Sequence, residues 1–167
     1  MEITADMVKA LREQTGFGVM DCKRALEKAE GDSAKAEDIL RDQGISSAAK
    51  KASRATNEGL IESYIHSGGR IGAIVEVNCE TDFVARTQDF QQLAHDLAMQ
   101  VAAMSPQYVD STDIPEGTEA DSQEECLMQQ PFIKDPTKTI QDLVNESVGK
   151  LGENVRVRKF TRFSLGE

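Results

Sequence analysis

Tryptophan is absent from this sequence of 167 residues, and so is any long apolar run. A membrane-spanning helix needs about 20 consecutive apolar residues, and no stretch approaches that length. The first residues also lack the basic-then-apolar pattern of a secretory signal, so neither a membrane span nor export is expected. Cysteine is scarce as well. Cys22, Cys79 and Cys126 are scattered and odd in number, which argues against a disulfide framework and favours a reducing compartment.

The motifs of common catalytic sites are also missing. The sequence contains no G-x-S-x-G nucleophile turn, no G-x-x-x-x-G-K-[ST] phosphate loop and no H-E-x-x-H zinc motif. No C-x-x-C or histidine-rich spacing suggests another metal site. Glu80 and Asp82 could form an acid pair for general acid-base catalysis, but no second group completes such a site. We therefore expect a protein that is not an enzyme and that binds no metal or cofactor.

Positive charge is in short supply. The chain has 19 Lys and Arg against 29 Asp and Glu, a formal net charge of -10, which argues against general nucleic-acid binding. Much of this excess is local, because seven acidic residues and no Lys or Arg lie between Asp110 and Glu125. The Pro, Gly and Ser content of the stretch predicts a solvated acidic loop at about residues 106–130.

The first part of the chain has the apolar spacing of three short helices. The predicted N-caps are Thr4, Asp21 and Asp32, and the glycines predicted to end the helices are Gly16, Gly31 and Gly44. Gly16, Phe17 and Gly18 form a tight turn between the first two helices. These features predict a three-helix module at residues 1–44.

The pattern changes after this module. Residues 45–57 are basic and have no apolar stripe, which predicts an exposed helical linker. Residues 60–66 and 71–78 are rich in Ile, Val and Tyr, as strands are, and residues 67–70 between them have the composition of a hairpin turn. This hairpin is the first predicted piece of sheet.

Helical periodicity returns at Thr87 and stops before Pro106, which cannot continue a helix. A further amphipathic helix is predicted at residues 139–151, followed by a strand at residues 154–165. In that strand we expect one face to carry Val155, Val157, Phe163 and Leu165 and the other to carry Arg156, Arg158 and Arg162. The predicted fold class is α+β, with the helical module followed by a core of antiparallel strands and helices at residues 58–167.

Phe83 stands among polar residues between the second strand and the core helix. Two hypotheses account for it. In the first, which physical chemistry alone favours, Phe83 belongs to the core and Asp82 caps a helix. In the second, Phe83 is an aromatic wedge on a rigid strand-to-helix corner.

Several segments resemble the elongation factor Ts family. Residues 15–26, TGFGVMDCKRAL, resemble the opening helical module of that family, and residues 78–85, NCETDFVA, resemble its second signature. Residues 48–52, 130–132 and 152–158 (AAKKA, QPF and GENVRVR) follow in the family's order. Together the segments cover nearly the whole chain outside the acidic loop.

The resemblance implies a ubiquitin-associated-like module that docks on the nucleotide-binding domain of elongation factor Tu. The docking residues that it implies are Gly16, Phe17, Gly18, Met20 and Asp21. It also implies that the core contacts the same domain, dislodges Mg²⁺ and promotes GDP release so that GTP can bind. The residues implied for this step are Thr81, Asp82, Phe83 and Val84. The expected partner is therefore elongation factor Tu, GDP-bound or nucleotide-free, and exchange of this kind requires no catalytic residue.

The sequence departs from the family pattern in two places. Members usually carry a pair of helices ahead of the segment at residues 130–132, where this chain has only the acidic loop. Long members carry two copies of the hairpin-and-helix unit, and this chain has one. We therefore expect a symmetric homodimer in which a second chain supplies the missing half of the contact surface.

Two other binding functions remain open. The three-helix module would suit a ubiquitin-binding adaptor, although the α+β core argues against it. A ribosome-associated or RNA-binding protein could use the basic residues of the last strand, which are Arg156, Arg158, Lys159 and Arg162. The expected compartment is a bacterial cytoplasm, or an organelle if a transit peptide has been removed, and no contact with membrane or DNA is expected.

Overall fold

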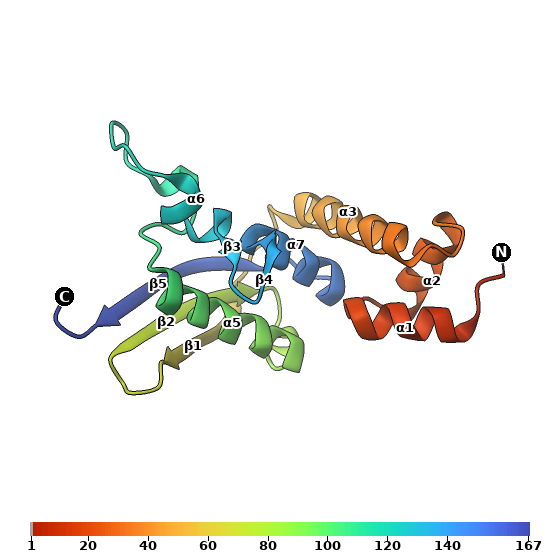
Figure 1. The fold of residues 1–167 in the computed structure, drawn as a ribbon, viewed down its shortest axis with the longest axis horizontal. Helices are drawn as coiled ribbons and strands as arrows, with labels where there is room; N and C mark the ends of the chain where they lie inside the picture. The colour runs from red at the N-terminus through yellow and green to blue at the C-terminus, as the bar shows by residue number, and fades with distance from the viewer. Residues whose placement is uncertain (1) are drawn as a thin grey trace.

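The computed structural model describes residues 2–167 as helices and antiparallel strands, so the predicted α+β class is confirmed. Figure 1 shows the N-terminal helices at one end of the molecule and a sheet with its helices at the other end. Each part has its own hydrophobic cluster. Within residues 2–167, no helix is both long and apolar enough to cross a membrane. The division into units at 1–44, 45–57 and 58–167 stays a prediction.

The N-terminal part consists of α1 (Ala5–Thr15), α2 (Val19–Lys28) and α3 (Ser33–Lys51). Thr4 and Asp32 cap α1 and α3 as predicted, each accepting a hydrogen bond from a backbone N–H three residues further on. The predicted cap at Asp21 is wrong, because α2 begins directly after Gly18 and Asp21 lies in its first turn. A carboxylate in that position still stabilises the helix through its dipole.

Gly44 does not end α3, which continues to Lys51. A Cβ atom on Gly44 would lie 3.0 Å from the backbone oxygen of Asn145 in α7 (Ile140–Leu151), and one on Gly149 would lie 3.2 Å from the Cα of Gly44. The backbones of α3 and α7 therefore approach each other closely, and Figure 1 shows the two helices alongside one another. Gly44 is thus a packing residue, although the sequence predicts that it ends a helix.

The core is built on a three-stranded antiparallel sheet, β1 (Glu58–Ile65), β2 (Ile71–Cys79) and β5 (Arg156–Ser164), in the order β1-β2-β5. The predicted hairpin between β1 and β2 is confirmed, and Gly68 and Gly69 adopt φ values of 94° and 66° in its turn, a conformation that glycine tolerates. Ala73, Val75 and Val77 of β2 are buried in the cluster that also contains the apolar face of α5 (Gln88–Met104). The core therefore lies between one face of the sheet and its helices.

The predicted alternation along the last strand is wrong in its second half. Glu76 and Val77, which are neighbours in β2, pair with Lys159 and Val157, so Arg158 is an extra residue in β5. A bulge of this kind moves all later side chains to the opposite face of the sheet.

Because of this change of face, two apolar residues expected in the core are exposed, and an arginine expected on the outside turns inward. Phe163 and Leu165, expected in the core, are 63% and 62% exposed. Arg162 turns inward, is half-buried and donates a hydrogen bond of 3.1 Å from Nε to the carbonyl oxygen of Ala102 in α5. The basic residues of β5 therefore do not share one face.

The acidic stretch contains three short helical turns, η1 (Ser111–Asp113), α6 (Ser122–Glu125) and η2 (Leu127–Gln129). Its seven acidic residues are exposed or half-buried. The end of the predicted loop is wrong, however, because Cys126, Leu127, Met128 and Gln130 are buried. Two short strands, β3 (Pro131–Phe132) and β4 (Asp135–Thr139), then pair and lead into α7. The solvated part of the stretch therefore ends before residue 126.

Candidate partner-binding site

Phe83 lies on a one-turn helix, α4 (Asp82–Ala85), which joins the end of β2 to α5. Its side chain is 78% exposed, the largest fraction among the exposed large hydrophobic residues of residues 2–167. Val84 and Ala85 of the same helix pack with the core cluster. The hypothesis that Phe83 belongs to the core is therefore wrong, and its ring stands in solvent at a strand-to-helix corner.

The cap of this short helix is Thr81 and not Asp82. The hydroxyl oxygen of Thr81 accepts a hydrogen bond from the N–H of Val84 at 3.4 Å. Asp82 lies in the first turn, and its carboxylate is 2.8 Å from the guanidinium of Arg86 in a solvent-exposed ion pair. Of the four residues predicted to act here, Phe83 and Thr81 are exposed and Asp82 and Val84 are half-buried. The hydroxyl of Thr81 is nevertheless engaged in hydrogen bonds within the protein, and Val84 packs against the core.

Two carboxylates hold the corner through reciprocal hydrogen bonds. Glu153 Oε2 accepts from the backbone N–H groups of Glu80 and Thr81, both at 2.9 Å, and the hydroxyl of Thr81 donates to Glu153 Oε1. In return, Glu80 Oε1 accepts from the backbone N–H of Asn154 at 2.7 Å. This last bond, helped by the side chain of Arg54, holds the pKa of the Glu80 carboxyl below its usual value.

The acid pair considered for Glu80 and Asp82 does not form, because the two carboxylates bind different partners. The nearby Cys79 is also unsuited to nucleophilic chemistry, since burial raises the pKa of its thiol to about 11 and the reactive species would be the thiolate. In the part of the chain that the structure describes, no three His, Cys, Asp or Glu side chains gather where a metal ion could bind. The corner offers an apolar ring and polar contacts to a partner.

The turn at residues 16–18 is placed differently from the corner. Phe17 is only 4% exposed, and its Cε1 atom lies 2.8 Å from the position that a Cβ atom on Gly149 of α7 would occupy. The ammonium of Lys150 is 5.9 Å from the centre of the Phe17 ring. The Phe17 ring is therefore packed against α7 and is not open to a partner.

Met20 and Asp21 complete the set of predicted docking residues, and both lie at the start of α2. Met20 is 58% exposed, and the carboxylate of Asp21 forms an ion pair with Arg24 at the surface. Docking by this region stays a prediction, and the side chains open to a partner are those of Met20 and its neighbour Val19, which is 48% exposed.

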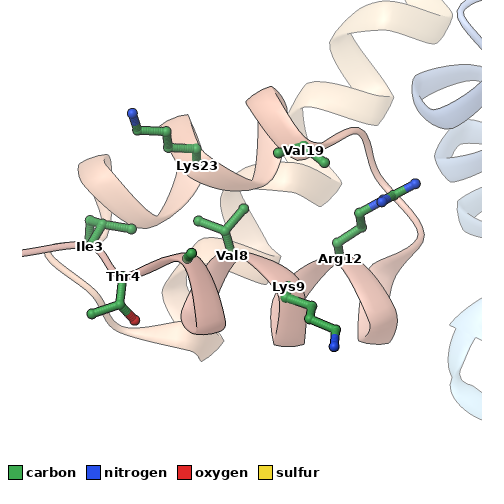
Figure 2. Close-up of a pocket in the computed structure, with 8 residues that line it drawn as sticks. Ile3, Thr4, Val8, Lys9, Arg12, Val19 and Lys23 are labelled. Atoms are coloured by element: carbon green, nitrogen blue, oxygen red, sulfur yellow. The ribbon is translucent and has the colours of Figure 1, made fainter.

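A groove of about 420 Å³ lies between α1 and α2, beside Val19. Figure 2 shows Val8 between the two helices and the long side chains of Lys9, Arg12 and Lys23 around it. The groove thus combines an apolar floor with three cations. It was not predicted from the sequence, although the spacing of three residues between Lys9 and Arg12 places both on one side of α1 and could have indicated a basic rim.

A second feature that was not predicted is an apolar patch on the outer face of the sheet, called here the outer sheet patch. It consists of Ile61, Ile65, Ile74 and Phe163, which are between 44% and 69% exposed. Gly72 pairs with Ile65 on one side and with Phe163 on the other, and the Cδ1 atom of Ile65 lies 2.6 Å from where a Gly72 Cβ would be. The patch depends on the bulge in β5, which brings Phe163 to this face.

Comparison with known proteins identifies the family. The family model for elongation factor TS matches residues 44–124. Elongation factor Ts of Carboxydothermus hydrogenoformans is 49% identical, with 99% of this chain and 90% of the relative aligned. Elongation factor Ts of Moorella thermoacetica is also 49% identical, with 99% of this chain and 96% of the relative aligned.

The protein of the same name from Thermotoga neapolitana is 47% identical over all of this chain and 99% of its own length. Each of these alignments spans 195 positions against the 167 residues of this chain, so the relatives contain residues that this chain lacks. Nearly half of the residues are identical over almost the full length of both proteins. The chain therefore belongs to the elongation factor Ts family of translation elongation factors.

Proposed function

We propose that this chain is a guanine nucleotide exchange factor that binds elongation factor Tu, displaces Mg²⁺ and promotes GDP release so that GTP can bind. Membership of the elongation factor Ts family supports this function. The observation that carries it is the exposed ring of Phe83 on a corner held by Glu80 and Glu153. A rigid apolar wedge suits a protein that acts by deforming a partner's site.

Nucleotide exchange by this route requires binding energy, and the exchange factor makes and breaks no covalent bond. The protein has only to bind the nucleotide-free partner more tightly than the GDP-bound partner, and GDP then weakens its binding by the same factor. Phe83 enters a crevice of the partner, where burial of an aromatic side chain is worth roughly 1.5 to 3 kcal/mol. Asp82 contacts the rim of that crevice, while Thr81 and Val84 fix the geometry of α4. The protein is accordingly not an enzyme in the usual sense.

The N-terminal helices supply a second contact with the same partner. Met20 and Val19 are exposed apolar anchors, and the groove beside them is rimmed by cations. An acidic amphipathic helix of the nucleotide-binding domain would match this surface in both charge and polarity. This contact contributes affinity, whereas Phe83 contributes the exchange itself.

The functional unit is a homodimer. The outer sheet patch exposes four large apolar side chains, and an isologous pairing about a two-fold axis would cover them in both copies. Light scattering should return the dimer mass for the wild-type protein and the monomer mass for Ile74→Lys. A monomeric wild-type protein at micromolar concentration would contradict the pairing without affecting the role of Phe83.

The bacterial source of the relatives supports a cytoplasmic location. Two structural observations count against the alternative functions. The Phe17 turn, which a ubiquitin-binding adaptor would use, is packed on α7. On β5, Arg158 binds Glu76 and Arg162 turns inward, so the strand presents no continuous basic face to RNA.

The direct test is the release of a fluorescent GDP from elongation factor Tu with and without this protein. We expect a strong acceleration that saturates with protein concentration and is greatly reduced by excess Mg²⁺ or by loss of Phe83. Unchanged release at saturating protein would refute the proposal. Binding to ubiquitin, or salt-sensitive binding to RNA that ignores guanine nucleotide, would favour one of the alternatives.

A further inference from the structure

The corner that carries Phe83 is joined to two other segments that are distant in the sequence. The turn after α7 provides Glu153 and Asn154, and the segment after α3 provides the carbonyl oxygens of Ala52 and Arg54. Asn154 Nδ2 donates to both carbonyls, at 3.4 and 2.9 Å, and Asn154 is only 4% exposed. The three segments thus meet at one hydrogen-bonded node.

Glu153 makes the contacts that bear most directly on Phe83. Its carboxylate accepts from two successive backbone N–H groups and from the hydroxyl of Thr81, the residue that caps α4. A carboxylate that receives several donors forms a strong, directional anchor. Glu153 therefore fixes the two residues that precede α4, and with them the direction in which the helix leaves β2.

The short helix needs such an anchor. A helix of one turn is unstable by itself. Forming the first turn fixes the backbone of several residues, and one turn has too few hydrogen bonds to offset that loss of conformational entropy. The ring of Phe83 contributes little packing, since most of it is exposed to solvent. Without a fixed residue at the N-cap, the ring would sample several directions and would have to be ordered when the partner binds.

We propose that Glu153 is a positioning residue that orients Phe83 for insertion into the partner. The proposal rests on the proposed exchange function and assigns to the turn after α7 a role in the rate of exchange. Glu153 does not touch the partner. It acts by keeping α4 in one orientation before the encounter, so that no ordering is needed at the moment of insertion.

Three substitutions separate the geometry of the anchor from its charge. Glu153→Gln keeps the length of the side chain, and its amide oxygen can still accept from both N–H groups. Glu153→Asp keeps the charge but is one methylene too short, and Glu153→Ala removes every acceptor. Positioning predicts that Gln retains most activity while Asp and Ala lose it, whereas a purely electrostatic role predicts that Asp is active and Gln is not. Glu119→Ala, in the exposed acidic stretch, is the charge-matched control.

The orientation of α4 can be measured in the free protein. Because the chain has no tryptophan, Phe83→Trp introduces a single tryptophan, whose fluorescence reports on the site. Time-resolved anisotropy should show restricted local motion of this indole when Glu153 is intact and after Glu153→Gln. The amplitude of nanosecond motion should be larger after Glu153→Asp or Glu153→Ala. Hydrogen exchange at the amides of Glu80 and Thr81 should accelerate in the same two variants.

Exchange kinetics complete the test with a double-mutant cycle. Glu153→Ala should lower the maximal rate of GDP release about tenfold, a typical consequence of a misplaced functional group. In the Phe83→Ala background the same substitution should have almost no further effect, because it acts through the ring. A general loss of stability would instead lower the melting temperature and the rate in both backgrounds.

Unchanged anisotropy after Glu153→Ala, or additive effects in the cycle, would overturn the proposal. A wild-type protein that failed to stimulate GDP release would overturn the proposed function instead, and the anisotropy of the free protein would still decide whether Glu153 orients residue 83. The two failures are therefore distinguishable.

Discussion

Phe17 and Phe83 each lie where one element of the fold joins the next, and the two rings have opposite environments in the structure. Phe17 lies between Gly16 and Gly18 and is 4% exposed, and Phe83 lies between Asp82 and Val84 and is 78% exposed. The family resemblance implies that both contact the same partner. Only one of the two rings is open to it.

The difference comes from the segment that each phenylalanine region contacts. Beside Phe17, α7 has a glycine at position 149, where any larger residue would collide with the ring, so the ring fits against the backbone of the helix. The corner of Phe83 is instead held by hydrogen bonds to Glu153 and leaves the ring in solvent. An aromatic residue in a turn thus stabilises the fold when a neighbouring element receives it, and is available for binding when polar contacts hold the turn.

The largest expected effect is on stability, at Phe17. Phe17→Ala should lower the free energy of unfolding by about 3–5 kcal/mol, because it leaves a cavity at the contact with α7. Gly149→Ala should also destabilise the protein, since its methyl group would overlap the ring. Denaturant unfolding followed by circular dichroism measures both. Wild-type stability of Phe17→Ala would show that the ring is not a structural element after all.

The next effect is on exchange, at Phe83. Phe83→Ala should keep nearly the wild-type melting temperature and reduce exchange efficiency by about tenfold to a hundredfold, corresponding to the lost burial of the ring in the partner. Asp82→Ala should have a milder effect. GDP release and calorimetry on the same samples provide the measurement, with Phe17→Ala as the converse control. A large drop in melting temperature, or a folded variant with normal exchange, would contradict the wedge.

A smaller effect is expected at the groove between α1 and α2. Reversing the charge of Lys9 and Lys23 together should raise the dissociation constant for elongation factor Tu about tenfold at low salt and leave the maximal exchange rate unchanged. The loss should shrink as ionic strength rises. Lys28→Glu, on the same helix as Lys23 but outside the groove, is the control. A lower maximal rate with unchanged affinity would contradict this assignment. The groove would then act in GDP release itself, as proposed here for Phe83, and would not contribute affinity.

Much of the fold follows from local signals in the sequence. Thr4, Asp32 and Thr87 each precede a helix and accept a hydrogen bond from its first turn, as N-capping residues do. The hairpin at residues 67–70 and the stop before Pro106 are equally local, since turn composition and the missing proline N–H determine them. Features of this kind need no knowledge of the rest of the chain.

The remaining features depend on contacts between distant segments. The bulge at Arg158 arises from pairing with β2, so the phase of Phe163 could not be read from β5 alone. Gly44 has the sequence context of a helix end, and its packing role is evident only from the close approach of α7 to α3. Glu80 and Thr81, which precede Phe83, are likewise held by Glu153, more than 70 residues further along the chain. A sequence motif can therefore locate a site, whereas the geometry of the site depends on contacts with distant segments that the motif does not reveal.

The smallest expected effect is a pH dependence that distinguishes the two turns. The folded-state pKa of Glu80 is lowered by the N–H of Asn154 and the charge of Arg54, so its bonds are complete above the ordinary pKa of a glutamate and are lost as pH falls through the lower folded value. Acidification should therefore loosen the corner, and the Phe83→Trp reporter should gain local motion as the pH falls below the ordinary pKa of a glutamate. The same titration with Glu80→Gln should be flatter, because its amide still accepts from Asn154 and does not titrate in this range.

A Phe17→Trp reporter, packed on α7 without a carboxylate anchor, should keep its anisotropy until the whole protein unfolds. If anisotropy is lost at both positions over the same pH range, acid unfolds the whole protein. That result would contradict a local loosening of the Phe83 corner.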